Sequence, residues 1–214
     1  MVADVVIEEI SYAAVNAARE IFDTTLGSGY VERSGFVRLI TSRHGVALRA
    51  TDTNGSTVGV VAGECLDLDA LVRSVPEDQA QAVRVALGTS CAEPVGLVRS
   101  VAVRPDVQHH GIGTQLVSAA ITALRQRGAN TLVSLGWADD RGCHIAGVLL
   151  ALAFQQRGVF DDFWFADSHQ RGYRCPSCGG PCRCQAHLFV GSIPAALDQL
   201  PVASMRIEGS RARR

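Results

Sequence analysis

The chain has 214 residues, of which 47% are hydrophobic and 19% charged, so it can form one large core and wholesale disorder is excluded. Its net charge is −1 and its pI about 6.6, so no overall positive field favours non-specific binding to nucleic acid or to membranes. All 20 basic residues are Arg, which excludes mechanisms that need a lysine Schiff base or a lysine nucleophile.

The N-terminal segment MVADVVIEEI has acidic residues where a secretion signal has a basic start, so we expect no signal peptide and a cytoplasmic protein. The longest nearly uncharged stretch, residues 143–154, is too short for a membrane-spanning helix, which needs about 20 apolar residues. In that compartment the seven cysteines are expected to stay out of structural disulfides.

Strands and helices alternate along the chain. The first half predicts a strand at 4–10, a helix at 11–22, two paired strands at 45–50 and 56–65, and an inserted segment at 67–93 with a helix that begins near Pro76. The second half predicts a strand at 94–105, a helix at 111–127, a strand at 131–137, a helix at 144–157, and strands at 159–165 and 187–191. We therefore expect an α/β fold with a mixed central sheet of six to seven strands flanked by helices.

A glycine-rich turn between a buried strand and a helix, VAVRPDVQHHGIGT at residues 101–114, is the most informative segment. The first turn of a helix has backbone N–H groups without partners, and the helix dipole adds positive potential there. Gly111 and Gly113 let a phosphate approach the backbone, Thr114 adds a hydroxyl, and the preceding histidine pair adds charge when protonated. The turn predicts a pyrophosphate site, with an ordinary tight helix start as the alternative.

Two other phosphate-binding motifs do not fit this turn. A Rossmann dinucleotide fold is disfavoured because the turn lies in the middle of the chain and lacks the third glycine at the required spacing. A Walker-type loop needs a lysine, which the chain does not contain.

The segment resembles the acyl-CoA-binding motif of the GNAT superfamily of N-acetyltransferases, which is Q/R-x-x-G-x-G/A after a strand of the type V-A-V-x-P. Gln108, Gly111 and Gly113 match the glycine motif, and residues 101–105 match the strand. In the order of its elements the resemblance covers residues 1–165.

This resemblance implies an N-acyltransferase, most simply an acetyltransferase, that moves an acyl group from acetyl-CoA or another acyl-CoA to an amine acceptor. It implies that backbone groups of Val101 and Val103 pair with the pantetheine arm. It assigns the pyrophosphate to Gln108, His109, His110, Gly111, Ile112, Gly113 and Thr114.

Catalytic residues common in that family are absent here. Many members have a proton-donating tyrosine in the last helix, four residues before a terminal glycine, and the position that we align with it is Phe154. Some have a basic glutamate on the cofactor-binding strand, where we align Leu97. The replacement candidates are Glu64, near a strand end, and Asp139 or Asp140, after a strand, acting directly or through water. Alternatively, Glu64 is solvated and the Asp pair caps the next helix.

The adjacent Cys143 and His144 do not predict a catalytic pair, because consecutive helical residues point in different directions. We interpret both as packing residues. A missing acid and base would not abolish transfer, since orientation and the reactivity of a thioester can provide much of the rate.

Four cysteines within residues 175–184 form a second motif, C-x-x-C-x-x-x-C-x-C, with Gly and Pro between them. Four thiolates satisfy a soft tetrahedral cation without leaving an open position, so we expect a structural Zn²⁺. The predicted ligands are Cys175, Cys178, Cys182 and Cys184, with His169 and His187 as substitutes. Free thiols or local disulfides are the alternative, and an iron–sulfur cluster is disfavoured by the crowded C-x-C. In the resembled fold the flanking strands border the acceptor cleft, so the metal is expected to shape that cleft or a docking surface.

These motifs divide the chain into an acyl-CoA-binding N-acyltransferase-like domain at 1–170, a zinc-binding loop with the final strand at 171–191, and a C-terminal extension with a basic tail at 192–214. Two other functions stay open. One is acyl transfer from another carrier, such as aminoacyl-tRNA or a carrier protein, which the arginines of the loop and tail favour. The other is a non-catalytic module that binds acyl-CoA and grips a partner with the zinc loop.

Overall fold

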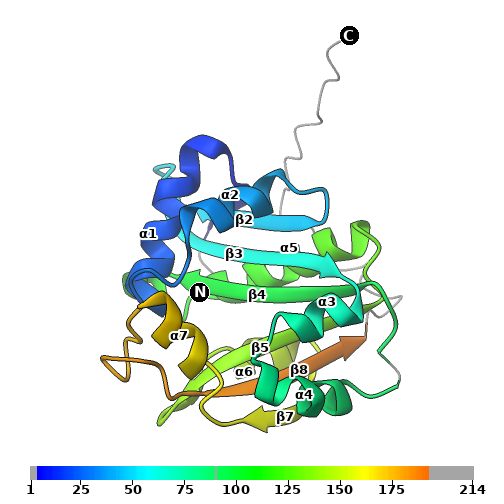
Figure 1. Ribbon diagram of the computed structural model, residues 1–214. Helices are drawn as coiled ribbons and strands as arrows, with labels where there is room; N and C mark the ends of the chain where they lie inside the picture. Colours follow the sequence, from blue (N-terminus) through cyan, green and yellow to red (C-terminus); the bar gives the residue numbers. More distant parts are fainter. Residues whose placement is uncertain (1–3, 90, 193–214) are drawn as a thin grey trace.

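The computed structural model describes residues 4–89 and 91–192, which form one eight-stranded sheet with helices on both faces (Figure 1). The strands are β1 Val6–Glu9, β2 Gly45–Thr51, β3 Thr57–Leu66, β4 Val95–Val103, β5 Thr131–Asp139, β6 Gly142–Cys143, β7 Gln155–Phe160 and β8 Gln185–Ser192. Their order is β1-β2-β3-β4-β5-β8-β7, with β6 beside β5. The predicted α/β class is confirmed, and the sheet has one strand more than the six to seven expected.

Within residues 4–89 and 91–192, five helices cover one face of the sheet and two cover the other. The first group is α1 Val15–Leu26, α2 Arg33–Thr41, α3 Leu68–Arg73, α4 Ala80–Leu87 and α7 Phe165–Arg171, and the second is α5 Ile112–Gln126 and α6 Ala146–Ala151. Short 3-10 turns cover Tyr12–Ala14, Glu77–Gln79 and Pro105–Val107. In the part of the chain that the structure describes, no helix is long and apolar enough to cross a membrane.

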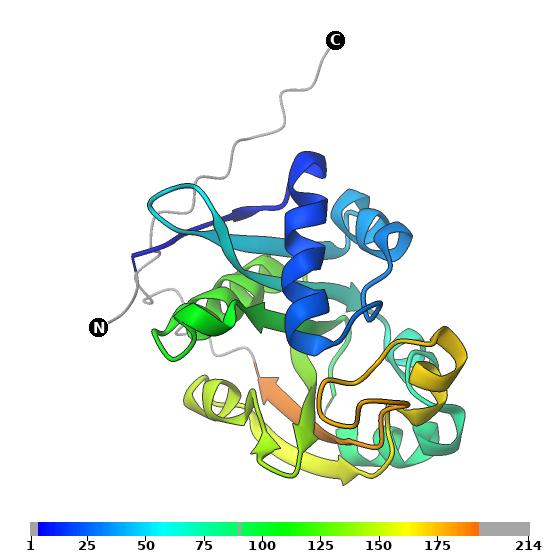
Figure 2. The ribbon, with the colours of Figure 1, turned by 90° about the vertical axis from the view of Figure 1, so that its left-hand side faces the viewer.

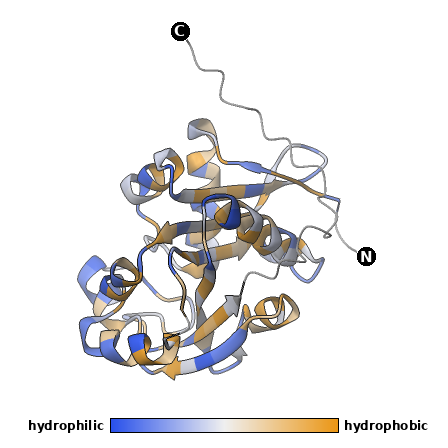
Figure 3. Ribbon diagram, turned by 90° about the vertical axis from the view of Figure 1, so that its right-hand side faces the viewer, coloured by the Kyte–Doolittle hydropathy of each residue, from blue (hydrophilic) through white to orange (hydrophobic). Residues whose placement is uncertain are grey.

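Neighbouring strand residues are buried on opposite faces of the sheet. Val46 and Leu48 belong to the apolar cluster that contains the inner face of α5, whereas Ala47 packs with α1 and α2. In the same way Val98 faces the α5 side and Leu97 the α3 and α4 side. The central strands are accordingly hydrophobic along much of their length (Figure 3).

The predicted elements differ from the structure between residues 144 and 171. The helix expected at 144–157 is only α6, because the chain turns at Ala153, whose φ is 63°, and then forms β7 in place of the strand expected at 159–165. β7 is an edge strand whose first three residues are exposed, so its sequence lacks the apolar alternation of a half-buried strand. α2, α3 and α7 were not predicted as separate helices.

The final strand does not stand apart from the rest of the fold. β8, which begins at Gln185 rather than at the predicted residue 187, pairs with β5 on one side and β7 on the other. The segment predicted as a zinc loop with a final strand therefore completes the central sheet. The predicted basic tail lies outside the described residues from 193 onward.

β4 and β5 run parallel and then diverge. Val95–Val98 of β4 pair with residues 131–134 of β5, and the pairing of these two strands ends there. β4 stays paired with β3 as far as Val103. The pairing with β3 shifts between Ala62 and Gly63, so Arg99 has no partner residue on β3 and forms a bulge. The edge of β4 beyond residue 98 that faces β5 is consequently free of any described strand.

Candidate active site

The turn between β4 and α5 places backbone amides at an open helix start. Gly111 is the N-cap residue with φ 81°, a left-handed conformation that favours glycine, and it has no side chain to cap the amides of the first turn. Nε2 of Gln108 donates a hydrogen bond of 2.9 Å to the carbonyl oxygen of Val103, which folds the turn back against the end of β4. Nδ1 of His110 donates to the carbonyl oxygen of Gln108 at 2.7 Å.

At position 113, neither the backbone conformation nor the surrounding atoms require a glycine. Its φ is not positive, and a Cβ at this position would meet only Cγ2 of Val103, at an ordinary contact distance of 3.9 Å. The missing side chain leaves space beside the first turn of α5, which suits a phosphate of an acyl-CoA. The structure thus gathers the predicted residues 108–114 at one helix start.

An apolar pocket of about 90 Å³ lies where β4 and β5 diverge. Its lining comes from both strands, from the end of α1 and the segment after it, from the residues before α6 and before α7, and from the cysteine loop. The lining residues are Leu26, Tyr30, Arg99, Ser100, Val101, Trp137, His144, Ile145, Trp164, Tyr173, Cys175 and Cys182. Val101, predicted to contact the donor, therefore opens into a pocket with aromatic walls.

A wider groove of about 940 Å³ adjoins this pocket and shares Tyr30, Arg99, Ser100 and Trp164 with it. The groove runs between α2, α3 and α7 on the face opposite α5. The Tyr30 hydroxyl lies at the junction, 3.1 Å from Oγ of Ser100 on β4. The pocket is thus continuous in its lining with a groove on the face opposite α5.

Glu64, one of the two predicted bases, lies in that groove. Its Oε1 accepts a hydrogen bond of 3.0 Å from Nε of Arg99 and a second from Nη2, and its side chain is 25% exposed. Glu64 is therefore held in an ion pair and is only partly solvated. The guanidinium of Arg99, which lines both the pocket and the groove, holds the Glu64 carboxylate in the groove.

Asp139, another predicted base, is almost completely buried, with 2% of its side chain exposed. It accepts hydrogen bonds from the Ser177 hydroxyl at 2.7 Å, from Nη2 of Arg141 at 2.8 Å and from the Arg141 backbone N–H at 3.0 Å, and Nε2 of His144 lies 3.1 Å from Oδ1. Burial alone would raise the pKa of Asp139, but these hydrogen bonds outweigh burial and hold the pKa well below its usual range.

A carboxylate stabilised in this way is a poor proton acceptor, so its geometry does not suit the base role predicted for Asp139. Helix capping does not fit either, because the N-cap residue of α6 is Ile145. Asp140, the neighbouring candidate, is exposed. Asp139 instead joins three segments, namely the end of β5, the residues before α6 and the cysteine loop.

His144 was interpreted as a packing residue in a helix, and the structure places it elsewhere. It lies between β6 and α6, its side chain is 41% exposed, and its ring stacks on Trp137 with centroids 4.7 Å apart. The short β5–β6 hairpin, which pairs Asp139 with Gly142, brings His144 back beside Asp139. No spacing rule in the sequence predicts this contact, because the hairpin creates it.

The structure also changes the residue that we align with the family tyrosine. α6 ends at Ala151, and the left-handed residue that follows it is Ala153, so the position four residues earlier is Leu149 rather than Phe154. Leu149 is fully buried in the core, and so is Phe154 at 3% exposure. Neither side chain carries a hydroxyl, and the phenol groups that line the pocket belong to Tyr30 and Tyr173.

The four predicted zinc ligands come together. The sulfur atoms of Cys175, Cys178, Cys182 and Cys184 all lie within 4.8 Å of one another. The backbone N–H of Cys178 donates to Sγ of Cys175, and that of Arg183 to Sγ of Cys178, both at 3.5 Å. Such bonds stabilise thiolates, so this donor set fits a Zn²⁺ ion. His169, stacked on Phe165, and His187 are outside the cluster.

The cysteine loop forms one wall of the pocket through Cys175 and Cys182. It also supports the opposite wall, because Gly27 (φ 120°) packs so closely on Arg174 that a Cβ would lie 2.2 Å from the Arg174 carbonyl oxygen. Both terminal nitrogens of Arg171 donate to the Tyr30 carbonyl oxygen at 3.1 Å. In Figure 2 the loop between α7 and β8 runs beside the end of α1.

Comparisons with known proteins agree with this geometry. Residues 43–144 match the Acetyltransferase (GNAT) family, and no curated protein sequence matches the chain. Among solved structures, the ribosomal-protein-S18-alanine N-acetyltransferase from Escherichia coli is similar with a TM-score of 0.59 and 17% identity over 92% of this chain and 99% of that one. NAA60 of Arabidopsis thaliana, solved with acetyl-CoA, gives a TM-score of 0.62 and 12% identity over 89% and 99%.

A third similar structure is the Drosophila melanogaster polyamine N acetyltransferase, which catalyses the formation of N acetylagmatine. Its TM-score is 0.58, with 15% identity over 89% of this chain and 100% of that chain. At these identities the solved structures establish the shared fold. The family match adds sequence similarity over residues 43–144 of this chain. The chain therefore has the GNAT fold, with similarity to the Acetyltransferase (GNAT) family over residues 43–144 and a four-cysteine loop before β8.

Proposed function

We propose that this protein is an acyl-CoA-dependent N-acyltransferase, most simply an acetyltransferase that acts on an amine. The observation that carries the proposal is the open start of α5, with its left-handed Gly111 and the unfilled space at Gly113, beside the free edge of β4. Amides of residues 108–114 would hold the pyrophosphate, and backbone groups of Val101 and Val103 would pair with the pantetheine arm.

The similar solved structures support an amine acceptor. Their names describe acetyltransferases of an alanine of ribosomal protein S18 and of a polyamine, and one similar structure was solved with acetyl-CoA. These acceptors differ greatly in size and charge. They therefore support the class of reaction, while the acceptor of this protein has to be inferred from the residues that line its own pocket and groove.

In the proposed reaction the apolar pocket holds the thioester and the attacking nitrogen together. Its aromatic walls exclude water, and alignment of the two reactants accounts for much of the rate. The ion pair of Glu64 with Arg99 lies in the groove and would orient the acceptor. The Tyr30 hydroxyl is a donor beside β4 for the departing thiolate.

We further propose that Cys175, Cys178, Cys182 and Cys184 bind Zn²⁺. Bound there, the ion would cross-link the loop through four thiolates and leave no coordination position for a substrate. Its role would be structural, and the loop it fixes is a wall of the proposed acceptor site. One zinc per chain in native mass spectrometry of the purified protein is the expected result.

Acyl transfer from aminoacyl-tRNA or a carrier protein gains little support from two of the three arginines near the loop. Arg171 is paired with Asp167, and Arg183 with Asp162 while it also covers the Phe165 ring. Paired guanidinium groups are poorly placed to neutralise a phosphate backbone. Salt-sensitive binding of RNA would nevertheless revive this alternative.

Turnover tests the proposed function directly. Acetyl-CoA is incubated with the protein and a panel of amines, namely agmatine, 2-phenylethylamine and a peptide with an N-terminal alanine, and released CoA is measured with a thiol reagent. We expect amine-dependent release with at least one acceptor. Binding of acetyl-CoA without release in a broad panel would instead favour a non-catalytic module, and absence of binding would contradict both.

A further inference from the structure

His144 connects the pocket with a buried carboxylate. Its ring lines the pocket together with Val101 of β4, and its Nε2 lies 3.1 Å from Oδ1 of Asp139. Because an ionised carboxylate only accepts hydrogen bonds, Nε2 must carry the proton of this contact. The neutral ring then has its lone pair on Nδ1.

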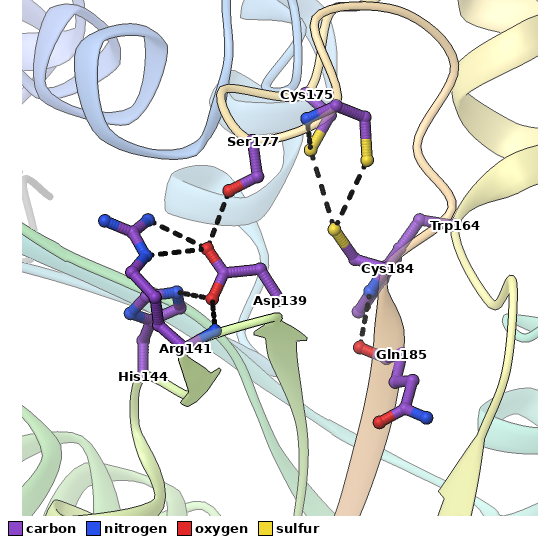
Figure 4. Close-up of polar contacts among 9 residues, drawn as sticks. Asp139, Arg141, His144, Trp164, Cys175, Ser177, Cys184 and Gln185 are labelled. Atoms are coloured by element: carbon purple, nitrogen blue, oxygen red, sulfur yellow. Dashed lines mark hydrogen bonds and ion pairs between the residues drawn. The ribbon is translucent and has the colours of Figure 1, made fainter.

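A second contact fixes the carboxylate itself. Ser177 lies between two of the four cysteines and donates its hydroxyl to Oδ2 of Asp139 at 2.7 Å, on the oxygen that Arg141 also binds (Figure 4). The ring is further held by stacking on Trp137, at an interplanar angle of 26°. The orientation of His144 is therefore set by β5 on one side and, through Asp139, by the cysteine loop on the other.

The other ionisable groups of the pocket are less suited to accept a proton. Arg99 is a cation paired with Glu64, and burial raises the pKa of Tyr173, so that its phenol stays protonated. Cys175 and Cys182 belong to the proposed metal cluster. Of the described residues that line the pocket, only His144 offers an imidazole, the side chain most often used as a general base.

We propose that His144 is the general base of the transfer and that Asp139 and Ser177 are positioning residues that hold its ring. The inference rests on the proposed function. As the amine nitrogen bonds to the thioester carbonyl carbon, its proton passes to Nδ1 of His144. The C–S bond then breaks with its electron pair on sulfur, the Tyr30 hydroxyl gives its proton to that thiolate, and the imidazolium proton returns through water to the Tyr30 oxygen. The products are an amide and CoA thiol, and the histidine is neutral again.

Replacement of the ring tests the base role. With acetyl-CoA and the amine of the panel that reacts fastest, we expect His144→Ala to lower kcat by about 10² to 10³-fold while the Kd of acetyl-CoA stays within about twofold. Added imidazole should restore kcat at least about tenfold, because it can enter the space left by the side chain. His144→Gln should be equally slow but not rescued. His44→Ala, at an exposed turn before β2, is the matched control and should behave like the wild type.

The test of the positioning residues has to distinguish a positioning role from a structural defect. Ser177→Ala should lower kcat by about tenfold, with the KM for acetyl-CoA, the zinc content and the melting temperature unchanged. Loss of zinc or of thermal stability in this variant would overturn the positioning role.

The outcomes separate this inference from the proposed function. If the wild type releases CoA and His144→Ala keeps kcat within about twofold, or loses it without imidazole rescue, the base assignment is wrong while the transferase function stands. If the wild type binds no acetyl-CoA and releases no CoA with any amine, the proposed function fails and the base assignment fails with it.

Discussion

The hydroxyl of Ser177 lies 2.7 Å from Oδ2 of Asp139, so the four-cysteine loop is bonded directly to the carboxyl end of β5. β5 is the strand that leaves β4 to open the pocket. The loop therefore contributes to the pocket in two ways. Its cysteines Cys175 and Cys182 line the pocket, and Ser177 holds the loop against the end of β5. A change in the loop should therefore affect the KM of the amine acceptor more than the KM of acetyl-CoA, which we propose to bind at the helix start of α5.

Loss of one cysteine tests this order of effects. We expect Cys182→Ser to abolish zinc binding, to lower the melting temperature by several degrees, and to raise the KM of the amine more than that of acetyl-CoA, because Cys182 lines the pocket and its backbone N–H is bonded to Ser168. Cys91→Ser, a partly buried cysteine outside the cluster, is the control. Equal rises in both KM values would contradict a loop that serves the acceptor side.

The two glycines of the turn should respond differently to substitution. Gly111→Ala forces a side chain into a left-handed conformation and should destabilise the protein by about 1 kcal/mol. Gly113→Val fills the open space without such strain and should weaken acetyl-CoA binding by at least about tenfold with little change in stability. Isothermal titration and thermal melting separate the two. An exposed glycine of α6 with open space around it provides the control, Gly147→Ala.

Acid titration should reveal the network around Asp139. The pKa of Asp139 is lower in the folded protein, so its contribution to stability is fully present above its unfolded pKa of about 3.9 and is lost as the pH falls from there toward the folded value. We expect Asp139→Asn to lower the free energy of unfolding by about 1 to 3 kcal/mol at pH 7. Urea unfolding at a series of pH values should show this difference shrinking below pH 4, and a constant difference would exclude the assigned cause.

The sequence predicted the parts of the site that depend on local spacing. The turn at residues 108–114 and the four cysteines are each contained in about ten residues, so a helix start with glycines and a cluster of thiols follow from residue type and interval. The contacts of Asp139 were not predictable in this way. Ser177 is 38 positions away along the chain, and His144 reaches the carboxylate only because β6 forms a hairpin with β5.

The same distinction explains the errors in the elements. The apolar run that ends near Phe154 resembles one long helix, since the sequence carries no glycine or proline where the chain turns. Ala153 adopts the left-handed conformation there without being a glycine, at a local cost that the burial of Phe154 offsets. Tertiary packing, which single-sequence patterns do not contain, thus decides where α6 ends and β7 begins.

Substitution of Tyr30 tests whether a phenol outside α6 serves the reaction. Its hydroxyl lies 3.1 Å from Oγ of Ser100, at the junction of the pocket and the groove, and its ring packs edge-on against Tyr173 at 5.5 Å. We expect Tyr30→Phe to keep this packing and to lower kcat by about tenfold or more through loss of the proton donor. Tyr12→Phe, which removes an exposed hydroxyl that bonds Arg33, is the control. A donor to the thiolate should matter less when the leaving group is more acidic, so a thioester with a low-pKa thiol should restore much of the rate of Tyr30→Phe. An equal loss with both donors would instead assign Tyr30 to binding the acceptor.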